Sequence, residues 1–334
     1  MDRIRYAVIG LGWFGEKHCE VIVDLPNAEL YALCSRTPAR LQAVANRFGV
    51  KNAYTDYSAL LANPAVDAVS ITTNWEQHAA PTLAALQAGK HVFLEKPMAS
   101  TLEECQAIVD AAYQAPGHFM VGHICRFNPR YAAAKAAIDE GRIGQILFLS
   151  SRRNLPRWVV TDILNQVSPL MSDGTHEADL MLWFTGAKVV TAYAQTLNVT
   201  GKKYPDIGST LYRFDSGAIG VVETVWYLPD KTAFQIDERM EIIGTEGAIS
   251  IQDTHPNFSI TDKEGWRSAD TTYWPVLHGV RSGALREELF YFVDGIQRGQ
   301  PPSVIRPEEA MAAVEACLAA EQSATTGQIV QLNH

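Results

Sequence analysis

The chain has 334 residues and 47% hydrophobic content, which is enough to bury a large core and predicts about two domains. Its 28 basic and 37 acidic side chains give a formal net charge of -9, a sign that disfavours binding to a nucleic-acid backbone. No run approaches the roughly 20 apolar residues that a bilayer span needs. The charged start MDRIRYAVIG leads into a strand rather than a secretory signal, so we expect a soluble cytoplasmic protein with no nucleic-acid or membrane partner.

The cysteines give no sign of a disulfide framework or a structural metal site. Five of them are scattered along the chain, an odd number without any Cys-x-x-Cys pair. We therefore expect no disulfide, no zinc site and no other metal. The cysteines are interpreted as small buried apolar residues: Cys19, Cys34, Cys105, Cys125 and Cys317.

From residue 5 to about residue 124, short apolar runs alternate with helical patterns. Strands this uniformly apolar, separated by helices, are typical of a parallel sheet covered on both faces. The first domain, residues 1–122, is therefore predicted to be an α/β doubly wound Rossmann sheet. The expected strands lie at residues 5–10, 29–35, 66–73, 91–95 and 119–124. Four helices are expected: one that follows the first strand and ends near residue 25, two at 38–48 and 78–88, and one from residue 102 onward.

Two of these helices carry recognisable end signals. Thr37 is the predicted cap of the helix that Pro38 opens and Gly49 closes. Ser100 and Glu103 form a predicted capping box for the helix from residue 102 onward.

After about residue 144 the pattern changes to closely spaced strands. The segments 214–217 and 244–247 supply hairpin turns, so we expect a C-terminal α+β domain, residues 123–334, with a large, mostly antiparallel open sheet. The segments YPDIGS, TDKEGWRSAD and GQPPS are predicted loops. The expected strands lie at 145–153, 188–199, 209–214, 218–228, 239–245 and 248–252, and the expected helices at about 129–140, 174–184, 283–298 and 307–322.

The motif GLGWFG, residues 10–15, joins the first apolar run to a helical pattern. In this context Gly10 ends a buried strand, Gly12 lies where a pyrophosphate approaches the backbone, and Gly15 begins a helix whose free N–H groups favour an anion. A tight turn is the alternative, because a glycine after a strand often only permits a positive φ. The strand-turn-helix context favours a dinucleotide site, with Trp13 and Phe14 in its loop.

The end of the second strand bears on the choice of cofactor. An acidic residue about 20 positions after the glycine loop binds the ribose of NAD, but here the strand ends in Ser35, Arg36 and Thr37, with Arg40 one turn further on. A guanidinium binds a 2′-phosphate in a forked geometry, so NADP(H) is favoured over NAD(H). The alternative is that Arg36 is a solvated charge that stacks on the adenine of either cofactor.

The segment HVFLEKPMA, residues 91–99, places two charges at the carboxyl end of an apolar strand, where open α/β sheets bind ligands. Alternation sends Glu95 and Lys96 to opposite faces, so only one of them should look directly into the crevice. Pro97 keeps Lys96 out of helical dihedrals. Beside an oxidised nicotinamide a partly buried ammonium has a lowered pKa and suits proton transfer; the alternative is a surface lysine paired with a carboxylate.

Other polar and aromatic residues follow the strands at the same edge. Arg126 is a candidate for lining the cleft or, alternatively, for an interdomain salt bridge. The aromatic residues either flank a nicotinamide or cover helix ends. The remaining candidates at this edge are Thr73, Asn74, Trp75, His78, His123 and Asn128.

The segment SDGTHEADLMLWF, residues 172–184, predicts an N-terminal cap followed by a helix with His176 in its first turn and Leu180, Trp183 and Phe184 buried. The positive end of a helix dipole lowers the pKa of such a histidine and favours the neutral imidazole that a general base needs. A hydrogen-bonded core histidine is the alternative.

Together, GLGWFG, AGKHVFLEKPMA at 88–99, RFNP at 126–129 and DGTHEADLMLWFTG at 173–186 resemble the Gfo/Idh/MocA oxidoreductases, which include glucose-fructose oxidoreductase and inositol dehydrogenase. The resemblance extends over nearly the whole chain. It implies a Rossmann domain followed by an α/β domain whose open sheet often forms the oligomer contact. It also implies that Lys96 contacts the nicotinamide ribose and the substrate hydroxyl, and that His176 works with it as acid or base.

One position departs from the pattern of the family that the chain resembles. Many members carry an aspartate four residues before the histidine, where this chain has Ser172, so the neighbouring Asp173 either replaces it or points elsewhere. Asp179, three residues after His176, matches an acid that touches the substrate in polyol-oxidising members, and a helix would place it beside His176.

The expected function is an NAD(P)-dependent dehydrogenase or reductase that moves a hydride between nicotinamide C4 and a carbinol carbon of a sugar or polyol. The alternatives are a redox-neutral, NAD-dependent glycosidase and a non-catalytic dinucleotide-binding sensor. Exposed apolar strand residues such as VVETVWYL favour a homo-oligomer, a dimer or tetramer. The candidates are Lys96, His176 and Asp173 for catalysis, Lys96, Arg126, His176 and Asp179 for substrate, and Gly10, Gly12, Trp13, Phe14, Gly15, Ser35, Arg36, Thr73, Asn74, His78, Glu95 and Lys96 for cofactor.

Overall fold

The computed structural model describes residues 3–252, 258–263 and 265–333. The chain divides into two compact units, one made of Met1–Asn128 and Thr271–Met311 and the other of Pro129–Asp270 and Ala312–His334. The first unit thus contains residues 271–311, which the expected boundary at residue 122 assigned to the second domain. The first two residues of the charged start, and Glu264 within TDKEGWRSAD, lie outside the described residues.

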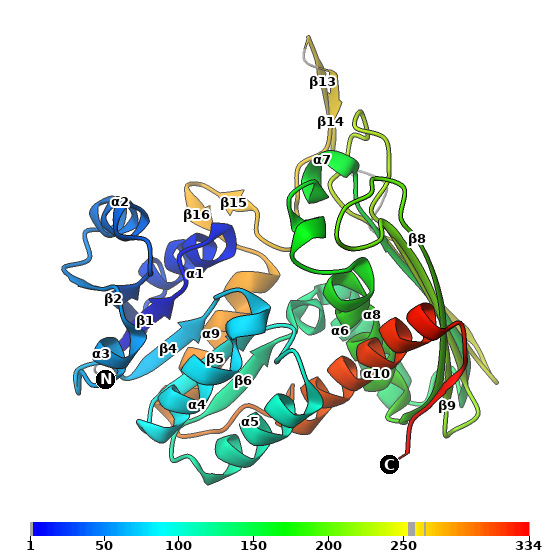
Figure 1. The fold of residues 1–334 in the computed structure, drawn as a ribbon, viewed down its shortest axis with the longest axis horizontal. Coiled ribbons are helices and arrows are strands. Elements are labelled where there is room, and N and C mark those ends of the chain that lie inside the picture. The colour runs from blue at the N-terminus through cyan, green and yellow to red at the C-terminus, as the bar shows by residue number, and fades with distance from the viewer. Residues whose placement is uncertain (1–2, 253–257, 264, 334) are drawn as a thin grey trace. The chain divides into compact units, whose positions relative to one another are not determined.

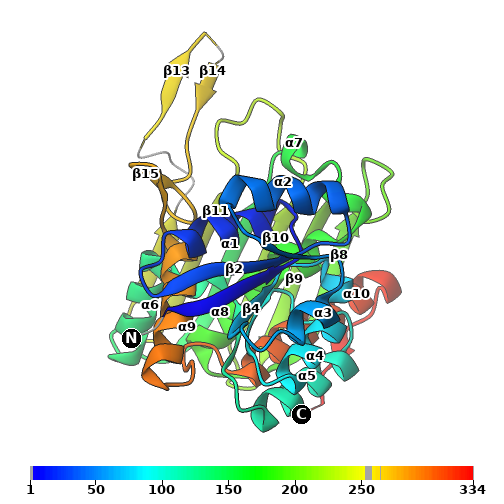
Figure 2. The same cartoon turned by 90° about the vertical axis from the view of Figure 1, so that its left-hand side faces the viewer.

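The first unit is built on one parallel sheet with helices on both faces (Figures 1 and 2). Its strands are β1 (Ile4–Ile9), β2 (Ala28–Cys34), β3 (Asn52–Tyr54), β4 (Ala68–Ile71), β5 (His91–Glu95) and β6 (Phe119–Gly122). Its helices are α1 (Trp13–Val23), α2 (Pro38–Phe48), α3 (Tyr57–Leu61), α4 (Ala79–Gln87), α5 (Leu102–Gln114) and α9 (Ala284–Arg298), with short 3₁₀ turns η1 (Trp75–Gln77) and η2 (Ile124–Phe127).

The strand order β3-β2-β1-β4-β5-β6 confirms the predicted doubly wound sheet. β4 and β6 are buried along their whole length, as a sheet covered on both faces requires. α1 and α9 lie on the same face, because His18 of α1 and Phe292 of α9 both pack edgewise on Phe93 of β5. The opposite face carries α3, α4 and α5.

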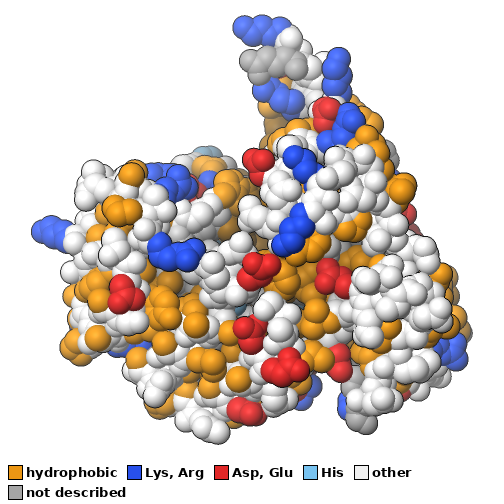
Figure 3. All heavy atoms as spheres, in the orientation of Figure 1, with side chains coloured by type: hydrophobic (Ala, Val, Ile, Leu, Met, Phe, Trp, Pro, Cys, Tyr) orange, Lys and Arg blue, Asp and Glu red, His pale blue; other side chains and the backbone are white. Residues whose placement is uncertain are grey.

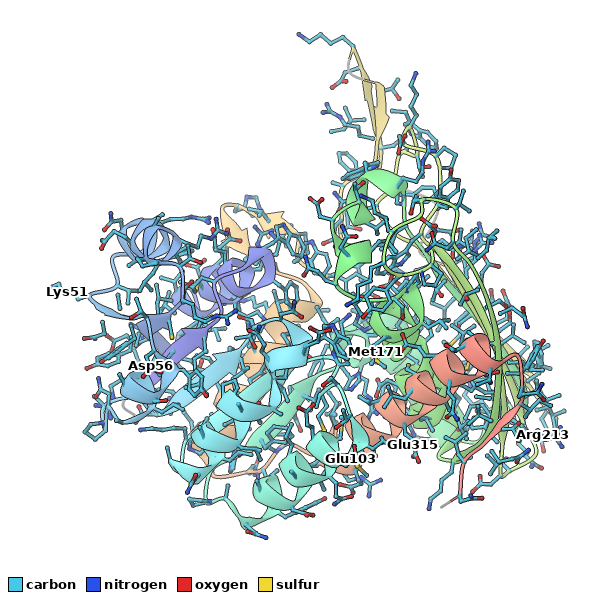
Figure 4. The ribbon with its side chains drawn as sticks, viewed as in Figure 1. Lys51, Asp56, Glu103, Met171, Arg213 and Glu315 are labelled. Carbon is cyan, nitrogen blue, oxygen red and sulfur yellow. The ribbon has the colours of Figure 1, made fainter. Side chains whose placement is uncertain are left out.

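Helix ends in this unit agree with the sequence signals at α2 and differ by one residue at α5. Thr37 and Gly49 flank α2, and Gly49 adopts the left-handed conformation at φ 69°. At α5 the cap is Thr101, whose hydroxyl accepts from the backbone N–H of Glu104, while Glu104 accepts from Ser100. The predicted Ser100/Glu103 pair is therefore wrong: Glu103, labelled in Figure 4, is an exposed first-turn residue.

The second unit is built on a seven-stranded sheet in the order β12-β11-β7-β10-β9-β8-β17. The neighbours β7 and β10 are parallel and the other pairs are antiparallel, which confirms the predicted mostly antiparallel sheet. The strands are β7 (Ile146–Asn154), β8 (Val189–Leu197), β9 (Ile207–Phe214), β10 (Ile219–Val225), β11 (Asp237–Gly244), β12 (Ala248–Gln252) and β17 (Val330–Gln331). The helices are α6 (Pro129–Asp139), α7 (Arg157–Val160), α8 (Pro169–Thr185) and α10 (Pro307–Thr326), with the turn η3 (Ile163–Asn165); α10 is divided between the units.

Helices cover one face of this second sheet. Tyr212 of β9 donates to the carbonyl of Ala316 on α10 at 3.3 Å, and α8 packs on β7, β9 and β10. Along β9 the residues alternate, so that Tyr212 is buried and its neighbours Leu211 and Arg213 are exposed on the other face. The alternation predicted for an open antiparallel sheet is therefore present.

Several short elements escaped the sequence pattern. They include β3 and α3, and a hairpin of β13 (Ile260–Asp262) and β14 (Gly265–Arg267) inside the predicted loop TDKEGWRSAD. The pair β15 (Val276–Leu277) and β16 (Val280–Arg281) belongs to the segment that joins the first unit. Strands of two or three residues have too short a period-two pattern to stand out.

Among the described residues, no helix is both long and apolar enough to cross a membrane. The five cysteines are free and buried, as expected. On the face drawn in Figure 3, Lys and Arg side chains are scattered among Asp and Glu side chains. That mixture agrees with the net charge of -9 and differs from the continuous basic surface of a nucleic-acid-binding protein.

Candidate functional site

The three glycines of the loop at residues 10–15 are required for different reasons. A Cβ on Gly10, which has φ 99°, would lie 2.7 Å from the backbone of Thr72, and a Cβ on Gly15 would lie 2.0 Å from the carbonyl oxygen of Gly10. A Cβ on Gly12 would meet no atom within 4 Å, and its φ of -71° suits any residue. The fold therefore needs Gly10 and Gly15, whereas Gly12 fits a backbone that a pyrophosphate approaches closely.

The helix that follows this loop presents its N-terminus to the same place. α1 begins at Trp13 with Gly12 as its N-cap, which has no side chain to satisfy the first N–H groups. Unsatisfied N–H groups and the helix dipole favour an anion. The loop and helix thus fit the phosphates of a dinucleotide.

Arg40 supports the loop from α2. Its Nε donates to the carbonyl of Leu11 at 2.9 Å, and its guanidinium pairs with Glu16 on α1. Arg36 at the end of β2 is exposed, and no partner for it is found among the described residues. Of the two arginines predicted near the adenosine ribose, only Arg36 is therefore uncommitted.

An aromatic cluster lies beside the glycine loop. Trp13 is 61% exposed, stacks on Phe14 with ring centroids 5.7 Å apart, and meets Trp274 edge-on at 5.5 Å. Trp274 comes from the segment before β15. Arg281, in the strand that pairs with β15, holds this region to α1, because its Nε donates to a carboxylate oxygen of Glu20 at 2.8 Å. The sequence pattern missed Trp274, because its place in the first unit depends on a long-range return of the chain.

Residues of the loop after β4 make hydrogen bonds to the backbone of neighbouring segments. Thr72 donates from Oγ1 to the carbonyl of Gly10 at 2.5 Å. His78 is buried, with Nδ1 2.8 Å from the carbonyl oxygen of Pro97 and Nε2 3.2 Å from that of Thr73. Burial lowers the pKa of His78. Asn74 is exposed and Trp75 half-buried in the same loop.

Glu95 and Lys96 differ in burial, as their predicted opposite directions imply. Glu95 is 6% exposed, and its Oε1 lies 3.0 Å from Nε2 of His18 inside the first unit. Lys96 is half-buried at the end of β5, and its peptide bond to Pro97 is cis. Lys96 is therefore the more exposed residue of this pair.

Arg126 is a buried structural residue of the first unit. Its guanidinium donates to Glu309 at 2.8 Å and to the carbonyl of Val304 at 2.6 Å. The pair with Glu309 lies within the first unit, so this contact is not the predicted interdomain bridge. His123 and Asn128 are buried nearby, and Asn128 donates to the hydroxyl of Tyr273 at 3.4 Å.

The helix that carries His176 begins earlier than predicted. Ser168 caps α8 by accepting from the backbone N–H of Met171 at 3.0 Å, and Pro169 is its first residue. His176 therefore lies in the third turn rather than the first, and the expected influence of the helix dipole on its pKa does not apply. The Ser-Pro pair at 168–169 was the signal for this start. Leu180 and Phe184 are buried as expected, but Trp183 is only half-buried.

Three polar candidates lie on the central part of α8. His176 is 7% exposed and Asp179 fully buried. Asp173 is also buried, and its Oδ2 accepts a hydrogen bond from the indole N–H of Trp226 at 2.6 Å. Asp173 is thus hydrogen-bonded to the residue that directly follows β10, a contact that the sequence did not suggest.

α8 also contributes Glu177 to a buried cluster of charged side chains. Arg153 of β7 donates to Glu177 at 2.8 Å and pairs with Glu238 of β11 at 3.2 Å. Burial raises the pKa of Glu177 to about 7, against the lowering effect of Arg153. Removal of the carboxyl group from water is therefore the main cause of the raised pKa, and the nearby charge of Glu238 adds to it.

Two family models match this chain over most of its length. The model described as "Oxidoreductase family, NAD-binding Rossmann fold" matches residues 4–123, and "GFO/IDH/MocA C-terminal domain" matches residues 131–250. The parallel sheet, its glycine loop and these matches define the class of protein: an oxidoreductase with an NAD-binding Rossmann domain.

Individual relatives agree. The scyllo-inositol 2-dehydrogenase (NAD(+)) of Bacillus subtilis is 30% identical over 339 residues, covering 99% of this chain and 97% of its own. The myo-inositol 2-dehydrogenase of Thermotoga maritima is 28% identical, covering 92% and 93%. The chain belongs to the Gfo/Idh/MocA family.

Solved structures support the same fold. The crystal structure of scyllo-inositol dehydrogenase from Lactobacillus casei with bound NAD(H) and scyllo-inositol has a TM-score of 0.85, with 24% identity and 99% coverage of both chains.

Proposed function

We propose that this chain is a dehydrogenase of cyclic polyols of the inositol class, using a nicotinamide dinucleotide. The relative named scyllo-inositol 2-dehydrogenase, which matches 99% of the chain, is the observation that carries the proposal. The bound dinucleotide supplies the hydride acceptor, and Gly12 with the N-terminus of α1 would hold its phosphates.

Lys96 and His176 are proposed as the groups that handle the hydroxyl proton. As the carbinol carbon gives up its hydride, the hydroxyl proton passes to Lys96, whose Nζ accepts it as a neutral amine. His176 then takes this proton from Lys96 and passes it on. Lys96 is half-buried at the carboxyl end of β5, where α/β sheets bind ligands. Asp179 and Asp173 neighbour His176 on α8, and hydrogen bonding to a rigid polyol would supply orientation.

The substrate class is tested by reduction of the dinucleotide at 340 nm with myo-, scyllo- and chiro-inositol, using pentoses and hexoses as comparison. Stoichiometric accumulation of the reduced form is expected with at least one inositol. Turnover of a glycoside without such accumulation would instead favour the redox-neutral alternative, and binding of the dinucleotide without any turnover would favour the sensor.

The role of Lys96 is tested by Lys96→Met. Loss of a positioned proton-transferring group costs about 10²- to 10⁴-fold in kcat. The variant should still bind the dinucleotide, because Gly12 and α1 are unchanged. Turnover at the wild-type rate would remove Lys96 from the mechanism.

The preference between the two dinucleotides is proposed to depend on Arg36. β2 ends without an acidic residue, which favoured NADP(H), but the Bacillus subtilis relative is named for NAD(+), so the relatives do not support that preference. We propose that NAD(H) is the cofactor and that Arg36 also admits NADP(H). Arg36→Ala should then lower NADP(H) affinity by about tenfold, within the range of a lost charge-assisted contact, while NAD(H) affinity changes little. An equal change in both would contradict this role.

A second copy of the chain is proposed to cover the open face of the seven-stranded sheet. Leu211 is 47% exposed there, opposite Tyr193 on β8, and Ile243 of β11 is 46% exposed. Arg213, labelled in Figure 4, lies on the same face of β9. Leu211→Glu should shift the mass measured by light scattering toward the monomer, whereas an unchanged mass would place the contact elsewhere.

A further inference from the structure

We propose that His18 and His78 are positioning residues for Lys96, each holding one of the two residues that flank it in the chain. The inference rests on the proposed proton-transferring role of Lys96. His18 binds the side chain of Glu95, and His78 binds the backbone carbonyl of Pro97. Both histidines are buried, and the proposed chemistry uses neither of them.

The contact on the Glu95 side is a chain of buried hydrogen bonds. Nε2 of His18 lies 3.0 Å from Oε1 of Glu95, and because a carboxylate only accepts, this nitrogen donates. Nδ1 of His18 is hydrogen-bonded to the hydroxyl of Ser70 at 3.0 Å, and that hydroxyl lies 3.0 Å from the hydroxyl of Tyr6. The second oxygen of Glu95 accepts from the backbone N–H of Lys96 at 3.3 Å. One carboxylate thus links α1 to the backbone of the lysine.

The space around Glu95 admits little other placement of its carboxylate. Gly122 faces it from β6, and a Cβ there would lie 2.8 Å from Oε1 and 3.1 Å from the carboxyl carbon. The rings of Phe14 and Phe93 pack edgewise on His18, with centroids 5.2 Å and 5.5 Å away. Gly122 therefore makes room for this rotamer of Glu95, and two aromatic rings fix the imidazole that binds it.

The contact on the Pro97 side comes from a different element. His78 follows η1 and begins α4, and its Nδ1 is 2.8 Å from the carbonyl oxygen of Pro97. A carbonyl oxygen only accepts, so Nδ1 donates in this contact, which is shorter than the 3.2 Å from Nε2 to the carbonyl oxygen of Thr73. The residues before and after Lys96 are thus tied to α1 and to the start of α4.

This arrangement matters because the side chain of Lys96 has four rotatable bonds and is only half-buried. An error in its backbone is carried to the ammonium, and a misplacement of about 1 Å in a reacting group can cost roughly 10²-fold in rate. Hydrogen bonds to the residues on both sides of Lys96 therefore limit the displacement of its backbone, and with it the displacement of the ammonium group.

Two substitutions of His18 separate the contacts that it makes. Glutamine can place its amide N–H near the position of Nε2 and keep the contact to Glu95, whereas asparagine reaches only the position of Nδ1. We expect His18→Asn to lower kcat by about 10- to 100-fold while His18→Gln stays within about threefold of wild type. His91→Asn is the matched control, since His91 lies at the other end of β5 and accepts from the backbone N–H of His118.

A second variant approaches Glu95 from the opposite side. Gly122→Ala introduces a Cβ 2.8 Å from Oε1 of Glu95 and 3.0 Å from Cε1 of Phe93, so it displaces the Glu95 carboxylate while both histidines are retained. Its kcat should fall as in His18→Asn. It keeps the test decisive if a His18 variant fails to fold.

A readout that needs no turnover follows the lysine itself. Competitive acylation of the protein without dinucleotide, read by mass spectrometry, gives the reactivity of Lys96 relative to the exposed Lys51, labelled in Figure 4. In His18→Asn and Gly122→Ala this ratio should change by about threefold or more, because a displaced Lys96 has a different pKa or a different accessibility to the reagent. In His18→Gln and His91→Asn it should stay at the wild-type value.

The outcomes separate this inference from the proposed function. If Lys96→Met abolishes turnover but folded His18→Asn and Gly122→Ala keep wild-type kcat and labelling ratio, the positioning role is wrong and the role of Lys96 stands. If Lys96→Met keeps turnover, the proposed function fails. Equal losses in His18→Asn and His18→Gln with an unchanged labelling ratio would show a merely structural histidine, and would overturn the inference.

Discussion

The buried cluster beneath α8 predicts a stability that depends on pH through one carboxyl group. Glu177 is fully buried with Arg153, Ser151 and Glu238 around it, and its pKa is raised from 4.5 to about 7. Glu177→Gln keeps an oxygen that can accept from Arg153 but removes the ionisable proton. Arg153 then retains a one-to-one pair with Glu238.

The size and sign of the effect follow from proton linkage. The folded protein holds the proton of Glu177 more tightly than the unfolded chain does, so the stabilisation is complete below pH 4.5 and is lost as pH rises through about 7. At about 1.4 kcal/mol for each pKa step of one, the loss amounts to about 3 kcal/mol. Glu177→Gln does not suffer this loss.

The assay is urea unfolding of wild type and Glu177→Gln at pH 5, 6, 7 and 8, followed by tryptophan fluorescence and circular dichroism. The free energy of unfolding of the variant should gain on that of wild type by about 3 kcal/mol between pH 5 and pH 8. A constant offset caused by altered hydrogen bonding does not affect this difference. Free energies of unfolding that differ by a constant amount across this range would refute the raised pKa of Glu177 and its cause, the burial of the carboxyl group.

Three further substitutions test the other contacts. Gly15→Ala should lower the free energy of unfolding of the first unit by about 2 kcal/mol or more, because its Cβ clashes with a backbone carbonyl. Gly12→Ala should keep a free energy of unfolding within about 1 kcal/mol of wild type and should weaken NADH binding in a fluorescence titration. Equal stability losses in the two variants would contradict the different roles of the two glycines. Trp226→Phe removes the hydrogen bond to Asp173 and should cost about 2 kcal/mol in urea unfolding, and a cost near zero would contradict that contact. Arg126→Met breaks an ion pair inside the first unit and should cost about 2 kcal/mol; a loss of substrate affinity at full stability would instead place Arg126 in the substrate site.

The regular architecture was predictable because it is encoded locally. Apolar strands such as β6 indicate a parallel sheet, and the cap signals at Thr37 and Gly49 mark the ends of a helix; both are patterns of a few residues. The switch to alternating patterns, as in β9, likewise predicted the second sheet. The glycine loop could be recognised for the same reason, since its three glycines occur within six residues.

What was not predictable depends on contacts between distant residues. The partner of Arg126 is Glu309, and that of Glu95 is His18, so sequence order gave no hint of either. The helix start at Ser168 was missed because Ser172 and Asp173 were interpreted as an N-terminal cap, whereas both lie within α8. The anchoring of Asp173 by Trp226 likewise needs the fold to bring them together.

The composition of the first unit has a consequence for synthesis on the ribosome. Its sheet is complete in sequence by Gly122, but α9, which places Phe292 against Phe93, is not translated until after residue 283. At about 5–20 residues per second, a nascent chain waits on the order of ten seconds or more before α9 covers its part of that face, which α1 covers only partly. A fragment ending at residue 128 would carry the same exposed apolar surface permanently, so residues 1–128 are a poor choice for expression in isolation.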